Sequence, residues 1–130
     1  MRFNPGAAAS LAPGVVTLSG LAEMIFATIS ELESDVRTLE TRSREAATTD
    51  RDYRRERSVA YLMAKGTIPE REATVAKATD ELRFRSQLAE DLKVAALEAV
   101  RSRRAKLSAL QTLANSLKAE MDLVGYGPHT

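Results

Sequence analysis

The chain has 130 residues, no cysteine and a formal net charge of +1, and 44% of its residues are hydrophobic. This length bounds the chain to one domain, and the lack of cysteine excludes a disulfide scaffold and a cysteine-ligated zinc site. The near-neutral charge gives no general attraction to nucleic acid or to an acidic membrane. An intracellular protein is the simplest interpretation of this composition.

The N-terminal segment is rich in residues that interrupt regular structure. Residues 1–16 contain Pro5-Gly6 and Pro13-Gly14, separated by alanines and a few other residues. We predict a flexible arm over 1–16, which is either ordered against a partner or has no role. No stretch of the arm is long and apolar enough for a secretory signal or a membrane span.

The first predicted helix is recognised by apolar residues at alternating steps of four and three. Thr17 or Ser19 can cap its start, and we place the helix over about 18–65. Its stripe is strongly apolar for three heptads and then becomes small and polar. The stripe consists of Leu18, Ala22, Ile25, Ile29, Leu32, Val36 and Leu39, followed by Ser43, Ala46, Asp50, Tyr53, Arg57, Ala60 and Ala64.

A helix stop and a helix start lie side by side in the middle of the chain. Gly66 can adopt the left-handed conformation that ends a helix. Thr67 and Glu70 have the spacing of a capping box, and Pro69 falls in the first turn, where a missing N–H costs nothing. This arrangement predicts an all-α fold, a long antiparallel helical hairpin, with a kink in one continuous helix as the alternative.

The second predicted helix covers about 68–124, because no glycine or proline occurs between Pro69 and Gly125; residues 125–130 form a C-terminal tail. A seven-residue series runs along it: Val75, Leu82, Ala89, Ala96, Arg103, Leu110, Leu117 and Val124. Members of this series have a second apolar residue a few positions further on. Early in the helix it comes three residues later (Ala78, Leu92 and Ala99), and later in the helix it comes four residues later (Val100, Leu107, Ala114 and Met121). The change predicts a stripe wider than a two-stranded seam.

A reversal at Gly66 places residue k of the first helix near residue 133 − k of the second, to within about one helical turn. Acidic residues of the first helix then lie near basic residues of the second: Glu31, Glu33 and Asp35 near Arg101, Arg103 and Arg104. The end away from the turn is the apolar end, and two helices alone do not cover it. We therefore predict assembly into a helical oligomer through Leu18, Ile25, Ile29, Leu32, Leu110, Leu113 and Leu117.

The sequence carries little that resembles catalytic machinery. The only histidine, His129, lies in the tail, and no glycine-rich phosphate loop or metal-binding motif is present. We therefore expect a protein that is not an enzyme and that has no cofactor and no bound metal.

Two basic clusters are the candidate functional residues. The first precedes the turn and contains Tyr53, Arg54, Arg55, Arg57, Tyr61 and Lys65. Tyr53, Arg57 and Tyr61 share one helix face, and interleaved rings and guanidinium groups suit single-stranded nucleic acid. A solvated face whose tyrosines simply pack is the alternative.

The second cluster lies in the second helix and contains Arg101, Arg103 and Arg104. The acids expected opposite it favour a structural interpretation. Arg103 falls in the predicted buried stripe, where a cation needs either an interhelical acid or a groove that holds an anion.

The order of these features over about residues 45–122 resembles the phage recombination mediator family typified by UvsY. The features are a basic helix with tyrosines, a Lys65-Gly66 turn, an acidic helix start, and a long helix carrying Arg101-Ser102-Arg103-Arg104. The resemblance implies a small helical protein that forms a ring, binds single-stranded DNA and helps to load a recombinase. It also implies a location in the cytoplasm of a host cell.

The resemblance points to particular nucleic-acid-binding positions, which are Arg57, Tyr61, Lys65, Arg101, Arg103 and Arg104. This chain departs from the family in its very short turn, its longer first helix and its fewer aromatic residues. Two functions therefore stay open. One is a homo-oligomeric single-stranded-DNA-binding recombination mediator; the other is a self-assembling helical scaffold, virion or adaptor protein without nucleic-acid binding. Neither has a membrane as its partner.

Overall fold

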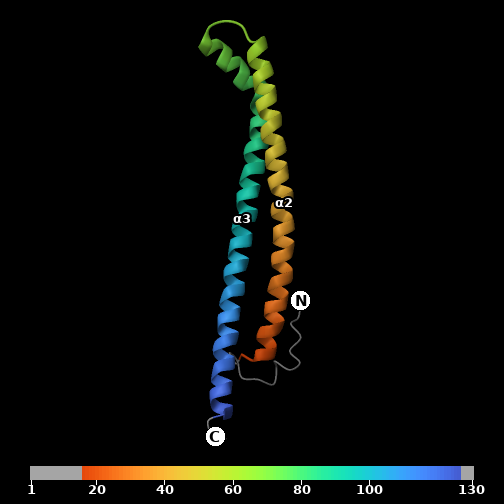
Figure 1. Cartoon of the computed structure of the whole chain (residues 1–130). Helices are drawn as coiled ribbons and strands as arrows, with labels where there is room; N and C mark the ends of the chain where they lie inside the picture. Colours follow the sequence, from red (N-terminus) through yellow and green to blue (C-terminus); the bar gives the residue numbers. More distant parts are fainter. Residues whose placement is uncertain (1–15, 127–130) are drawn as a thin grey trace, which may run out of the picture. The chain divides into compact units, whose positions relative to one another are not determined.

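The computed structural model describes residues 16–126, which form two helices and no strand, α2 (Leu18–Met63) and α3 (Ile68–Tyr126). The two long helices pack against each other and are joined by a short connection (Figure 1), which confirms the predicted all-α helical hairpin. The chain divides into two compact units. The turn unit is Glu31–Arg104, and the terminal unit includes the described residues 16–30 and 105–126.

The helix ends follow local hydrogen bonding. Thr17 caps α2, because its Oγ1 accepts a hydrogen bond from the backbone N–H of Gly20 at 3.0 Å. α2 ends at Met63, two residues before the expected end. α3 continues to Tyr126, one residue past the expected end at Gly125, because a glycine lowers helix propensity without forbidding a helix. The arm and tail predicted at the two ends of the chain fall largely on residues 1–15 and 127–130, outside the described residues.

The reversal occurs where the sequence predicts it. Gly66 has φ +107°, a conformation that residues with a Cβ rarely adopt. Thr67 Oγ1 accepts from the backbone N–H of Glu70 at 3.4 Å and donates to Glu70 Oε1 at 2.9 Å. The guanidinium of Arg71 donates to the carbonyl oxygen of Tyr61 at 3.0 Å, so that the start of α3 holds the end of α2. A continuous helix is excluded.

The seam of α3 in the turn unit follows a heptad pattern. Nine of its buried and half-buried residues alternate in steps of four and three: Val75, Thr79, Leu82, Ser86, Ala89, Lys93, Ala96, Val100 and Arg103. Of the partners expected three residues later, Ala78 and Ala99 are exposed, so the predicted change of spacing is wrong at those two positions. Leu92 is half-buried as predicted, and with the half-buried Leu97 it widens the stripe beside the heptad positions. The rest of the pattern was missed because Thr79, Ser86 and Lys93 are polar.

In the terminal unit the fully buried residues of α2 lie one residue before predicted stripe positions, while the predicted Leu18, Ile25 and Ile29 are half-buried. Leu21 is buried, with 1% of its surface exposed, whereas the predicted Ala22 is exposed. Thr28 is equally buried and satisfies its hydroxyl by donating to the carbonyl oxygen of Met24 at 2.7 Å. Leu110 is the buried residue that α3 contributes here.

The structure predicts that Gly66→Val destabilises the hairpin by about 1–2 kcal/mol, because a β-branched residue resists a positive φ. A Cβ at this position also lies 2.7 Å from Glu70 Oε2, which is the end of a flexible side chain. The Cβ of the Gly66→Asn variant makes the same close contact. Asn tolerates positive φ better than Val, so Gly66→Asn is the matched control and should lose less stability. Urea unfolding of the two variants measures the difference, and equal stability of Gly66→Val and wild type would contradict the requirement.

Candidate nucleic-acid interface

The first basic cluster lies on the last turns of α2, within the turn unit. Three of its residues, Arg54, Arg57 and Tyr61, share a sector of about 60° around the helix axis, and Lys65 follows two residues after the end of the helix; these four residues are called the α2 strip. Arg55 lies about 160° from Arg57, on another side of the helix, and does not join the strip. Tyr53 is half-buried at the edge of the strip that faces α3.

The aromatic part of the strip is already engaged by a cation. The guanidinium carbon of Arg57 lies 5.5 Å from the centroid of the Tyr61 ring, a cation–π contact. Tyr61 is half-buried, and Arg57 is exposed. Because a base can stack on a guanidinium plane as well as on an aromatic ring, this pair offers a flat stacking surface.

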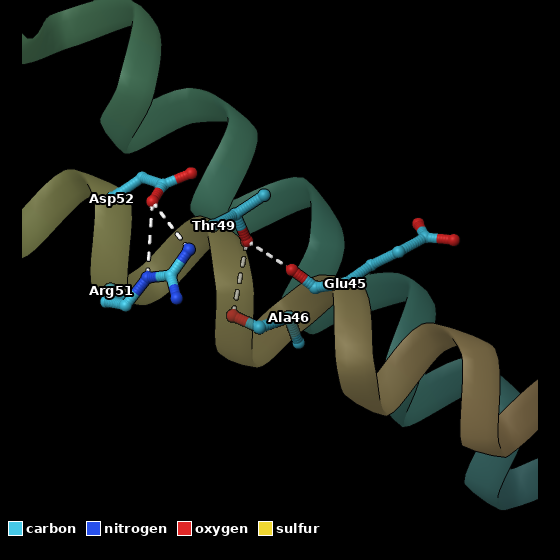
Figure 2. Close-up of polar contacts among 5 residues, drawn as sticks. All are labelled: Glu45, Ala46, Thr49, Arg51 and Asp52. Atoms are coloured by element: carbon cyan, nitrogen blue, oxygen red, sulfur yellow. Dashed lines mark hydrogen bonds and ion pairs between the residues drawn. The ribbon is translucent and has the colours of Figure 1, made fainter.

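Acidic neighbours reduce the charge of the region that precedes the strip. Arg51 donates to Asp52 Oδ1 from Nε at 3.4 Å and from Nη2 at 3.3 Å, as Figure 2 shows. Arg54 pairs with Asp50 Oδ2 at 3.0 Å. Such exposed pairs contribute about 0–1 kcal/mol each, so a phosphate can displace the carboxylate at small cost. Within residues 16–126, Arg55, Arg57 and Lys65 form no ion pair.

The same close-up shows how the middle of α2 keeps its backbone polar groups occupied. The Thr49 hydroxyl donates to the carbonyl oxygens of Glu45 at 2.9 Å and Ala46 at 3.2 Å (Figure 2). Thr49 is thereby turned back along its own helix and makes no contact with Arg51. The polar side chains on this stretch of α2 therefore bond within their own helix.

An open groove of ≈ 490 Å³ lies between α2 and α3 in the turn unit. Tyr53 and Arg54 line it from α2, and Arg83, Gln87 and Lys93 line it from α3. The sequence interpretation missed these α3 residues. The pairing rule applied to Tyr53 gives residue 80, about one turn from Arg83, and this signal was sufficient to find them.

Arg103, from the second cluster, is held by acids of α2. Its Nε donates to Asp35 Oδ2 at 3.0 Å and its Nη1 to Glu31 Oε2 at 3.2 Å. The hydrogen bond to Asp35 raises the pKa of Arg103 above its ordinary value. The predicted proximity of Arg103 to these two acids is confirmed, and an interhelical acid accounts for a cation in the seam. With its guanidinium occupied on two sides, Arg103 no longer counts among the expected nucleic-acid contacts.

The two remaining residues of the second cluster, Arg101 and Arg104, differ in their contacts. Arg101 pairs with Glu98 of its own helix at 2.8 Å, and Arg104 is exposed. Glu33 forms no ion pair within residues 16–126. Because Arg103 contacts Asp35, nineteen residues of α2 separate this cluster from Arg54, which corresponds to roughly 30 Å along the helix. The two basic clusters are therefore separate patches of the turn unit.

No group of histidine, aspartate or glutamate side chains that could hold a metal ion occurs in the part of the chain that the structure describes. Neither described helix contains an apolar stretch long enough to cross a membrane. Comparisons with protein-family models, with curated proteins and with solved structures found nothing that matches this chain. The proposals below therefore rest on its own residues and on the resemblance drawn from its sequence over about residues 45–122.

Exchanging the two charges of the Arg103–Asp35 pair tests whether it fixes the helix pairing. Arg103→Asp alone places three acids together and should lower the midpoint of thermal unfolding. Adding Asp35→Arg restores an opposite pair, and the new arginine also lies four residues from Glu31 on α2, so the double variant should recover most of the loss.

Arg101→Asp is the control, since it reverses an exposed charge that pairs only within α3. It should lower the midpoint less than Arg103→Asp does. A double variant that is no more stable than Arg103→Asp would show that the interhelical pair has no energetic coupling.

Proposed function

We propose that this chain is a homo-oligomeric single-stranded-DNA-binding protein of the recombination-mediator kind. The observation that carries the proposal is the α2 strip, which places two cations and a tyrosine ring in one sector of a helix, with Lys65 two residues after its end. Rings that stack on bases and cations that follow phosphates are the two components of sequence-tolerant single-strand binding. The resemblance of residues 45–122 to recombination mediators supports the same function.

In the binding mechanism the cations of the strip contact phosphates, and Arg57 also forms a stacking surface with Tyr61. Arg54, Arg57 and Lys65 contact consecutive phosphates, and Arg54 exchanges its weak partner Asp50 for a phosphate oxygen. A base stacks on the flat surface formed by Arg57 and Tyr61. Because one copy reaches only a few phosphates, each site is weak, and linked copies raise the effective concentration for one strand.

Self-association is supported by the apolar side chains that a single chain leaves exposed. In the terminal unit these include Phe26 and Leu113, and in the turn unit Phe84 and Leu88. Scattered exposed apolar residues are normal on a monomer, but pairs spaced four residues apart, such as Phe84 and Leu88, form stripes that suit another helix. A recombinase is the protein partner that this function requires. A protein with this function acts inside the cell, in the host cytoplasm if a phage encodes the chain.

A structural scaffold, virion or adaptor protein without nucleic-acid binding is the second candidate. The observation that favours it is the apolar tip of the hairpin, where Leu62, Met63 and Ile68 are 86%, 74% and 70% exposed. The ion pairs of Arg51 and Arg54 with neighbouring aspartates agree with a merely solvated face. In this candidate the tip packs against a second copy of the chain.

The proposal predicts salt-dependent binding of an unstructured oligonucleotide. Each phosphate contact adds about 0.7 to the slope of log K against log salt, so Arg57→Ala and Lys65→Ala should each reduce the slope by about that amount. Tyr61→Ala should weaken binding by about 1–3 kcal/mol if its ring supports a stacked base. Fluorescence anisotropy at several salt concentrations measures both effects.

Arg101→Ala is the matched control for this titration, because Arg101 is exposed and lies in the other basic cluster, away from the α2 strip. Its slope should equal that of wild type. An intact oligomer that binds no single strand at low salt removes the nucleic-acid proposal and leaves the structural candidate.

The proposed assembly predicts that Leu113→Glu produces smaller particles with unchanged helix content. Leu113 is 47% exposed within the chain, so a charge there opposes contact between copies without entering the core. Leu110→Ala is the contrasting variant: Leu110 is 8% exposed, and its truncation should cost about 2–3 kcal/mol of folding stability. Sedimentation velocity with circular dichroism separates the two effects, and a wild-type monomer at micromolar concentration would refute assembly.

A further inference from the structure

The groove between α2 and α3 in the turn unit has a charge balance that depends on one residue. Its cations are Arg54, Arg83 and Lys93, and its acids are Asp50 and Glu90. Arg54 lies 3.0 Å from Asp50, and Lys93 lies 3.9 Å from Glu90, so each acid has its own cation. Arg83 supplies the excess positive charge, and it forms no ion pair within the described range 16–126.

We infer that α3 forms the second wall of the single-strand site and that Arg83 binds a phosphate of the strand lying in this groove. The inference rests on the proposed function and deepens it, since it identifies the path of the strand. The exposed guanidinium of Arg83 offers planar donors that match the geometry of a phosphate. Arg54 stands on the opposite wall and can hold the next phosphate.

The groove also has the size and lining that a nucleotide needs. Its volume of ≈ 490 Å³ lies within the range of about 300–1,000 Å³ that small-ligand sites occupy. The half-buried ring of Tyr53 forms part of one wall, and the polar side chains of Ser86 and Gln87 form part of the other. A base can therefore lie against a ring while its backbone remains between Arg54 and Arg83.

The chain contains a close match to Arg83 that differs in one respect. Arg85 lies two residues further along α3 and is also exposed, but its Nε is 3.3 Å from Glu81 Oε1, and it does not line the groove. Substituting either residue removes one positive charge from the same stretch of one helix. Only the Arg83 substitution makes the groove neutral, so comparing the two variants separates a specific contact from general electrostatic attraction.

The experiment titrates the full-length chain into a fluorescent oligothymidylate at a series of salt concentrations. Arg83→Ala should reduce the slope of log K against log salt by about 0.7, and Arg85→Ala should leave it within error of wild type. Arg83→Lys should restore most of the slope, because it returns the charge without the planar donors. Circular dichroism and sedimentation confirm that each variant keeps its helices and its assembly, as an exposed position allows.

Equal slopes for Arg83→Ala and Arg85→Ala, with wild type binding normally, would overturn this inference and leave the proposed function intact. A wild-type protein that binds no oligothymidylate would overturn both. If Arg83→Ala alters assembly, Arg83→Gln takes its place in the same titration, since it keeps the length and hydrogen-bonding capacity of the side chain while removing its charge.

Discussion

The contact of Arg103 with Asp35 and Glu31 joins α2 and α3 of the turn unit through two hydrogen bonds between side chains far apart in the sequence. The rest of the α3 seam there mixes Val75, Leu82, Ala89, Ala96 and Val100 with Thr79, Ser86 and Lys93, and the burial of apolar side chains is not directional. A directional pair of hydrogen bonds to two carboxylates discriminates between neighbouring registers, as a single polar residue does in a coiled coil. The lining of the groove depends on this register, because a slip of one heptad would move Arg83 away from Tyr53.

The charged residues of the turn unit thus fall into two groups with different structural roles. Arg103 is directed inward and joins the helices, while Arg101, Arg51 and Arg54 pair with acids close to them in the sequence. These local pairs are exposed and weak. They keep polar groups on the surface of a nearly neutral chain and do not bind it to a partner. Arg57, Lys65, Arg83 and Arg104 form no ion pair within residues 16–126. The proposed binding surface lies at the first three and not around Arg104, because the α2 strip and the groove combine cations with the rings of Tyr61 and Tyr53.

The hairpin was predictable because its signals are local. A positive φ at Gly66 and a cap at Thr67 require only neighbouring residues, and both occur as expected. The seam was predicted less well, since Thr79, Ser86 and Lys93 were passed over as polar although short hydroxyls bond back to their own helix and a lysine stem packs along the seam. The pairing of Arg85 with Glu81, four residues earlier, was readable from the sequence, and the pairing rule places Arg83 near Tyr53 only to within about one turn.

Photo-cross-linking of a single strand to the full-length protein tests the central claim most directly. An oligonucleotide containing 5-iododeoxyuridine is irradiated with the protein at low salt, and the attached peptides are identified by mass spectrometry. The account predicts cross-links at Tyr53 or Tyr61, the rings beside the groove and within the α2 strip. Cross-links confined to the segment 101–106, or none at all at saturating oligonucleotide, would contradict it.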